Sequence, residues 1–125
     1  MTAKSGTPKP DSLGQFEQLV LTAILMLRDE AYGVPIHDKV TELADRRINM
    51  GSLYVTLDRL ERKHLVFSWL SRATVERRGK PKRFYRLEPD GLRALEESVA
   101  TSKRVAGAFD DSWSFRKWKP KRVMR

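Results

Sequence analysis

The most regular pattern of apolar and polar residues lies between Ile48 and Val66. Within it Leu53, Leu57 and Leu60 recur at i, i+4 and i+7, which places them on one side of an α-helix. The residues expected on the opposite face and its flank are small, β-branched or cationic: Ser52, Val55, Thr56, Arg59, Arg62 and Lys63.

Two interpretations of this helix fit its outer face. Small residues near the N-terminus let a helix enter a DNA major groove, where valine can contact a thymine methyl and arginine can bind guanine or phosphate. A solvated amphipathic helix with ordinary surface charge would show the same pattern. The flanking sequence has to decide between them.

Two further helices are expected before this one. Ser12 and Gln15 have the spacing of a capping box, and the helix that follows should end near Arg28–Glu30. A second helix should start around Pro35, since proline is tolerated in a first turn, and run for about three turns. Asn49 is the expected N-cap of the third helix, which completes a helix-turn-helix behind a supporting helix.

A β-hairpin is expected after the third helix. Residues 65–70 alternate as in a strand, residues 83–87 form a second strand, and the Gly and Pro between them favour a loop. His64 stands where a glycine would usually end the helix. The hairpin loop is cationic, through Arg77, Arg78, Lys80, Lys82 and Arg83. It could be a flexible solvated loop, but after a helix-turn-helix it is typical of a wing that contacts the DNA backbone.

The net charge of +9 is concentrated in two segments. Residues 1–65 are neutral, whereas residues 66–87 contain seven basic side chains and one acid, and the last 15 residues are also strongly basic. Such segregation indicates a polyanionic partner.

The last helix should begin near Pro89 and run past Ala100. From Leu92 onward a 3.5-residue seam suits packing of one helix along another, and its members are Leu92, Leu95, Val99, Ser102, Ala106, Phe109 and Trp113. The seam could pack on its own domain, as we expect for Leu92 and Leu95, or on a second copy, as we expect for Phe109 and Trp113.

Other function classes lack their usual residues. There is no cysteine, the two histidines are isolated, and there is no phosphate-binding glycine loop and no carboxylate pair in an apolar setting, so we expect no enzyme, no metal and no cofactor. No apolar run is long enough to span a membrane, and the N-terminus lacks a signal-peptide pattern, so we expect a cytoplasmic protein without membrane contact.

Ordered motifs resemble the PadR family of bacterial transcriptional regulators. They cover roughly residues 13–95 and are Leu13-Gly14-Gln15-Phe16-Glu17, Ala31-Tyr32-Gly33, Gly51-Ser52-Leu53-Tyr54, Leu57-Asp58-Arg59-Leu60-Glu61 and Tyr85-Arg86-Leu87. The resemblance implies a winged helix-turn-helix, a C-terminal dimerisation helix, binding of double-stranded DNA as a homodimer, and usually repression. It also implies that Asn49–His64 is the DNA-contacting helix, including Asn49, Gly51 and Tyr54. Two positions depart from the family pattern, His64 and Glu88.

The sequence therefore predicts a mainly α protein with a small β-hairpin. We expect a disordered arm at 1–11, a winged helix-turn-helix at 12–87, a dimerisation helix at 88–113 and a basic tail at 114–125. The expected function is a sequence-specific repressor at a two-fold symmetric operator; the alternative is a non-specific RNA- or ribosome-associated basic protein. Because the C-terminal region is short, any small-molecule effector would sit at the dimer interface.

Overall fold

The computed structural model describes residues 12–72 and 80–113. The elements in order are α1 (Gln15–Leu27), a 3-10 turn η1 (Arg28–Glu30), α2 (Gly33–Ala44), α3 (Met50–Arg62), β1 (Val66–Leu70), β2 (Arg83–Leu87) and α4 (Pro89–Trp113). This is the predicted mainly helical fold with one hairpin. The predicted arm at 1–11 and tail at 114–125 lie outside the described residues, and the domain boundaries stay a prediction.

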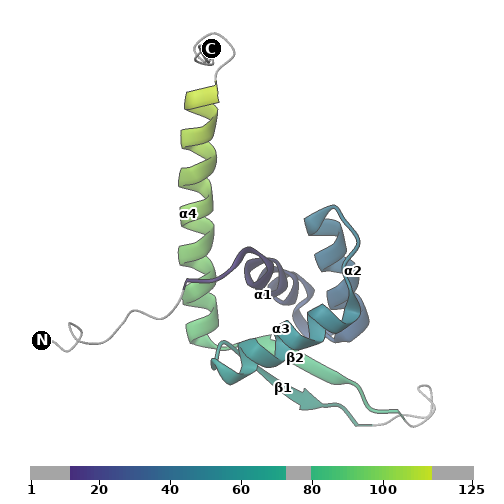
Figure 1. Cartoon of the computed structure of the whole chain (residues 1–125). Coiled ribbons are helices and arrows are strands. Elements are labelled where there is room, and N and C mark those ends of the chain that lie inside the picture. The colour runs from purple at the N-terminus through teal and green to yellow at the C-terminus, as the bar shows by residue number, and fades with distance from the viewer. Residues whose placement is uncertain (1–11, 73–79, 114–125) are drawn as a thin grey trace, which may run out of the picture.

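Helices α1, α2 and α3 gather over the two-stranded sheet, and α4 extends away from them (Figure 1). They share one core, in which the side chains of Leu53, Leu57 and Leu60 are fully buried. Burial of each leucine contributes about 1.5–3 kcal/mol, so the leucine pattern that predicted α3 also attaches it to the core. The other large, fully buried side chains are Val20, Leu21, Ile36, Val40 and Val66.

The predicted capping of α1 is wrong, whereas that of α3 is confirmed. Helix α1 starts with Gly14 as its N-cap, and the carboxylate of Glu17 accepts a hydrogen bond from the Gly14 N–H at 3.0 Å. Glu17 therefore performs the role expected of Gln15. At α3, Asn49 Oδ1 accepts a hydrogen bond from the Ser52 N–H at 3.0 Å, as an N-cap should.

Helix α3 ends in a geometry that usually requires glycine, although this chain has no glycine there. The Leu65 N–H bonds to the Leu60 carbonyl and the His64 N–H to the Glu61 carbonyl, the pair of bonds that defines a Schellman motif. His64 occupies the left-handed position with φ of 63°. The chain can then leave α3 sharply and enter β1.

The hairpin is antiparallel, with Ser68 opposite Tyr85 and Trp69 opposite Phe84. It is also attached to the segment before α2, because the Tyr85 N–H bonds to the Ala31 carbonyl at 2.9 Å and Tyr32 forms a bridge with Phe84. The hairpin base is thus fixed relative to the start of α2.

Helix α4 begins in close contact with the end of α3. A Cβ placed on Gly91 would lie 1.9 Å from the Leu65 carbonyl oxygen, so only glycine fits there. The same carbonyl accepts a hydrogen bond from the Glu88 N–H at 2.9 Å. Among the described residues, no helix is both long and apolar enough to cross a membrane.

Candidate DNA interface

Helix α3 presents the outer face that its sequence predicted, with one exception. Ser52, Val55 and Arg59 are exposed, and more than half of the Val55 side chain is open to solvent. A small hydroxyl, an apolar branched group and a guanidinium therefore line one side of the helix. This combination suits contact with base edges in a major groove.

Thr56 is the exception, and its assignment to the DNA contacts is wrong. Only 4% of its surface is exposed, and it lies among the buried residues of α3. Thr56 is three residues after Leu53 and four before Leu60, so it shares their face of the helix. Its short side chain fits that face without opening the core.

Two other predicted contacts have structural tasks at the start of α3. Asn49 uses its side-chain oxygen to cap the helix. A Cβ on Gly51 would lie 2.9 Å from that same oxygen, so Gly51 leaves space for the cap. The rest of the first turn can approach a partner closely.

Tyr54 is half-exposed and is fixed by its contact with α2. A Cβ on Gly33 would lie 2.3 Å from the Tyr54 hydroxyl oxygen, which shows how closely the phenol packs on the first residue of α2. The hydroxyl therefore lies beside the α2 N-terminus, where backbone N–H groups favour an anion.

The two cations near the end of α3 both form ion pairs, Arg62 within α3 and Lys63 with α1. Arg62 forms an exposed ion pair with Asp58 at 3.0 Å, one turn away on the helix. Lys63 lies 3.0 Å from the Glu17 carboxylate, whose side chain is 9% exposed. Lys63 thus attaches the end of α3 to the start of α1, in addition to any contact with DNA.

Glu17 is ionised more readily than an ordinary glutamate. Burial raises the pKa of its carboxyl, but the Gly14 N–H and the nearby Lys63 and Arg59 charges together lower that pKa below its usual value of 4.5. The charged form of this α1 residue is therefore favoured beside α3.

The wing cations are only partly described. Arg77 and Arg78 lie outside the described residues, and Lys80 is exposed. Lys82 lies over the Tyr32 ring at 4.5 Å from its centroid, and Arg83 donates to the Ser68 hydroxyl at 2.9 Å. The last two cations thus also contribute to the hairpin, whose outer face has stacked Trp69 and Phe84 rings.

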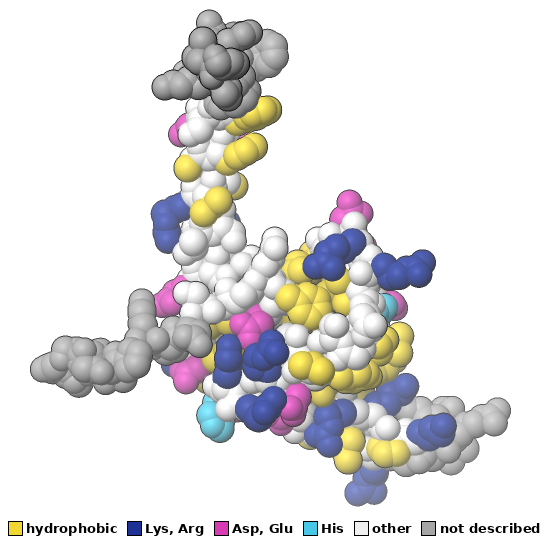
Figure 2. Space-filling model, viewed as in Figure 1, with side chains coloured by type: hydrophobic (Ala, Val, Ile, Leu, Met, Phe, Trp, Pro, Cys, Tyr) yellow, Lys and Arg dark blue, Asp and Glu magenta, His cyan; other side chains and the backbone are white. Residues whose placement is uncertain are grey.

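Three exposed arginines were missing from the predicted interface. Arg46 and Arg47 lie in the turn between α2 and α3, and Arg72 follows β1. None of them makes a hydrogen bond or ion pair within the described part of the chain. Figure 2 shows Lys and Arg side chains over α3, near the α2–α3 connection and beside the hairpin. Adjacent arginines in the turn of a helix-turn-helix were the available signal.

The predicted seam of α4 divides between two environments. Leu95 is 4% exposed in the chain's own core, as expected for this position, so it is not available to a dimer interface. Leu92 was expected to pack in the same way, but it is 40% exposed. Val99 also packs against that core, and the Ser102 hydroxyl donates to Gln18 Oε1 at 3.3 Å. The remaining members are exposed, and they are Leu92, Ala106, Phe109 and Trp113.

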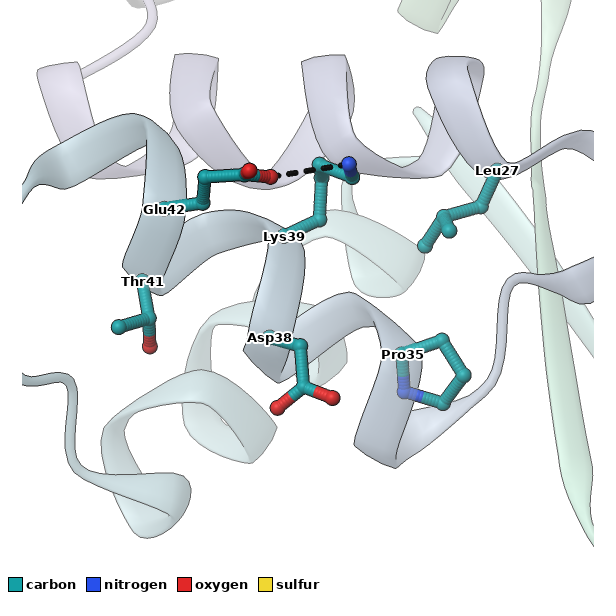
Figure 3. Close-up of a pocket in the computed structure, with 6 residues that line it drawn as sticks. All are labelled: Leu27, Pro35, Asp38, Lys39, Thr41 and Glu42. Carbon is teal, nitrogen blue, oxygen red and sulfur yellow. Dashed lines mark hydrogen bonds and ion pairs between the residues drawn. The ribbon is translucent and has the colours of Figure 1, made fainter.

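The shallow cavity between α1 and α2 offers no site for chemistry. It has a volume of about 440 Å³, and two of its three charged residues, Lys39 and Glu42, pair with each other at 2.9 Å (Figure 3). The third, Asp38, lies 3.8 Å from His37. Among the described residues, no group of three or more His, Cys, Asp and Glu side chains could hold a metal ion.

An exposed helix face of a helix-turn-helix, a hairpin wing and surrounding cations define a winged-helix DNA-binding protein. Residues 21–97 match the family model described as the transcriptional regulator PadR-like family. The chain belongs to this family, which comprises DNA-binding transcription regulators and not enzymes. Family membership favours DNA regulation over the RNA-associated alternative.

Solved structures agree with this assignment. A PadR-like regulator from Bacillus cereus strain ATCC 14579 is 22% identical, with a TM-score of 0.63 over 76% of this chain and 87% of that chain. A PadR-like transcription factor from Bacteroides fragilis is 27% identical, with a TM-score of 0.62 over 78% and 89%. Bordetella bronchiseptica BpsR, whose DNA binding is regulated by 6-hydroxynicotinic acid, shares the fold at 22% identity, with a TM-score of 0.58 over 86% and 72%. A comparison with curated proteins gave no match.

Proposed function

We propose that the protein is a homodimeric repressor that contacts a two-fold symmetric operator through α3. The observation that supports this most directly is the outer face of α3, where Ser52, Val55 and Arg59 are exposed while the opposite face is fully buried. Such a helix can enter a major groove without disturbing the core. Repression follows if the operator overlaps a promoter.

Base contact and phosphate contact are assigned to different groups. Arg59 on α3 is the candidate for guanine, because arginine can donate two hydrogen bonds to that base. Arg46 and Arg47 in the turn before α3 and Lys80 in the hairpin loop are candidates for phosphates, which fix orientation but not sequence.

The first experiment compares Arg59→Ala with Arg46→Ala. The operator is first located by binding to DNA upstream of the protein's own gene, with bulk DNA and structured RNA as competitors. Arg59→Ala should weaken operator binding by about 1–3 kcal/mol and leave non-specific binding nearly unchanged. Arg46→Ala should weaken both and flatten the logarithmic salt dependence by roughly one unit. Equal losses for both variants on all DNA would reject the base-contact role of Arg59.

The dimer is proposed from the exposed stripe of α4. Val105, Phe109 and Trp113 are each more than half exposed at a spacing of four residues, and the last two rings are stacked at 6.0 Å. Figure 2 shows hydrophobic side chains along one side of this part of the helix. A second copy would cover them and place two α3 helices about one DNA turn apart.

Sedimentation at micromolar concentration tests the dimer without DNA. The wild type should sediment at about twice its 14.5 kDa mass, and Val105→Asp with Phe109→Asp should shift it towards monomer. A wild-type monomer under these conditions would reject this role of α4.

The effector expected at the dimer interface also stays a prediction, supported by the regulated DNA binding of the Bordetella protein.

A further inference from the structure

The outer face of the hairpin holds a row of aromatic rings that lies outside the core. Trp69 stands opposite Phe84 in the register, and Phe67 precedes Trp69 by two residues, so the three rings share one face of the sheet. Val66 and Tyr85 are buried on the opposite face, which packs on the core. Phe67 is 39% exposed and Trp69 is 38% exposed, so the row is open to a partner.

The rings of this aromatic row have similar orientations. The planes of Phe67 and Trp69 differ by 31° with centroids 5.7 Å apart, and those of Trp69 and Phe84 differ by 20° with centroids 5.9 Å apart. The Tyr32 ring adjoins the row, with its centroid 5.2 Å from that of Phe84. Aromatic side chains held side by side on a sheet can stack with nucleobases, because every base has a π-face. The geometry suits a partner with several planar groups.

The hairpin that carries the row is strongly cationic. Its described residues, 66–72 and 80–87, include five basic side chains and no acid. Asp29 offsets one of them through its ion pair with Arg86 at 2.5 Å. Arg86 lies 5.6 Å from the centroid of the Trp69 ring, and Lys82 lies 4.5 Å from that of Tyr32. Cations next to stacking rings are the combination that binds the phosphates and bases of a single strand.

The positive charge argues against other occupants of this face. A second copy would bring an equally cationic hairpin against the first. The chain's own termini are cationic as well, because residues 1–11 contain two lysines and one acid, and residues 114–125 contain six basic side chains and no acid. An acidic peptide could pair with the cations, but it would not stack on the rings. A nucleic acid strand complements both the charge and the rings.

We propose that the outer face of the hairpin binds single-stranded DNA. Unpaired bases stack on Phe67 and Trp69, and the phosphates between them pair with Lys82. Bases within a duplex are already stacked on one another, so this face binds a form of DNA that α3 does not. DNA is favoured over RNA because the hairpin is the wing of a DNA-binding family, beside α3, where a locally opened duplex would present its single strand. The inference depends neither on the operator nor on the dimer.

The variants Trp69→Leu and Trp69→Phe separate stacking from apolar packing. Leucine keeps a large apolar side chain in the hairpin but removes the ring, whereas phenylalanine retains a ring. Leu43→Ala is the control, because it shortens an apolar side chain of matching exposure, 39%, in the last turn of α2. Thermal unfolding of the three variants checks that each is folded.

Fluorescence anisotropy of labelled oligo(dT) of about 12 nucleotides tests the proposal on the full chain. Wild type and Leu43→Ala should bind it equally, and Trp69→Leu should bind about fivefold or more weakly, as expected for the loss of one stacked base. The affinity of Trp69→Phe should lie closer to wild type than to Trp69→Leu. A duplex of the same length should bind wild type and Trp69→Leu equally, which separates this face from α3.

Four results would each overturn the proposal. They are no binding of oligo(dT), unchanged oligo(dT) affinity in Trp69→Leu, an equal loss of duplex and single-strand affinity in that variant, and tighter binding of oligo(U) than of oligo(dT). Competition by oligo-glutamate as effective as that by unlabelled oligo(dT) would also overturn it, because charge alone would then explain binding. Failure of the Arg59→Ala experiment concerns only the duplex and leaves this test unaffected.

Discussion

The two halves of α4 share one continuous helix but have different surroundings. Residues 89–99 contact the winged domain through Gly91, Leu95 and Val99, whereas every residue from 100 to 113 is exposed. The same apolar seam crosses both halves. Its periodicity therefore does not reveal which residues stabilise the chain's own fold and which are available to a partner.

The largest difference in the free energy of unfolding is expected between variants of the buried Leu95 and the exposed Phe109. Leu95→Ala should lower the free energy of unfolding by about 2–5 kcal/mol, because it removes buried methyl groups and leaves a cavity. Phe109→Ala should change monomer stability by no more than about 0.5 kcal/mol. Urea unfolding at low protein concentration measures both changes. Similar losses of unfolding free energy would show that the free half of α4, residues 100–113, is covered within one chain.

The glycines of the two halves should respond with opposite signs. Gly91→Ala would place a Cβ against the Leu65 carbonyl and should cost about 1–3 kcal/mol. A Cβ on Gly107 would have no neighbour within 4 Å, so Gly107→Ala should stabilise the helix by about 0.5–1 kcal/mol. Thermal unfolding of the two variants checks the signs, and a gain for Gly91→Ala would contradict the close contact.

The boundary between the halves is marked by Gln18 of α1. Its Oε1 accepts hydrogen bonds from Ser98 at 2.5 Å and from Ser102 at 3.3 Å. Ser98→Ala should therefore cost about 1 kcal/mol and Ser102→Ala clearly less. Urea unfolding of both variants in a Gln18→Ala background is the control, because the difference between the serines should then disappear.

The smallest effect is expected at the turn that ends α3, which supports the packed half of α4, residues 89–99. His64→Gly should raise the free energy of unfolding by about 0.5–1 kcal/mol, since glycine adopts the left-handed conformation more easily. Arg62→Gly, two residues earlier within α3, should instead destabilise by about 1 kcal/mol. Thermal unfolding tests the pair, and a loss at position 64 would indicate that the histidine side chain itself stabilises the turn.

Local patterns predicted what local forces determine. The leucines of α3, the Asn49 cap and the two strands of the hairpin depend on neighbours within a few residues, and they were found as expected. Thr56 was misplaced because its position lies at the edge of the buried face, where size and packing decide exposure.

Contacts between distant segments were not predictable from these patterns. Lys63 pairs with Glu17 across 46 positions, and Gly91 meets the Leu65 carbonyl only once the hairpin has closed. The ion pair of Arg86 with Asp29 likewise joins residues 57 positions apart. Such features require the three-dimensional arrangement.

Because the contact between Gly91 and Leu65 holds α4 near its base, a small rotation there would move the far end of the helix by a much larger distance. From Gly91 to Trp113 the helix extends roughly 33 Å at 1.5 Å per residue, so a 5° rotation at its base would move the far end by roughly 3 Å. In a dimer joined through the free halves, that rotation would alter the separation of the two α3 helices. Pro89 and Leu92 at the base of α4 also border a cavity shared with the ends of α1 and β2, so this cavity lies where such a rotation would start.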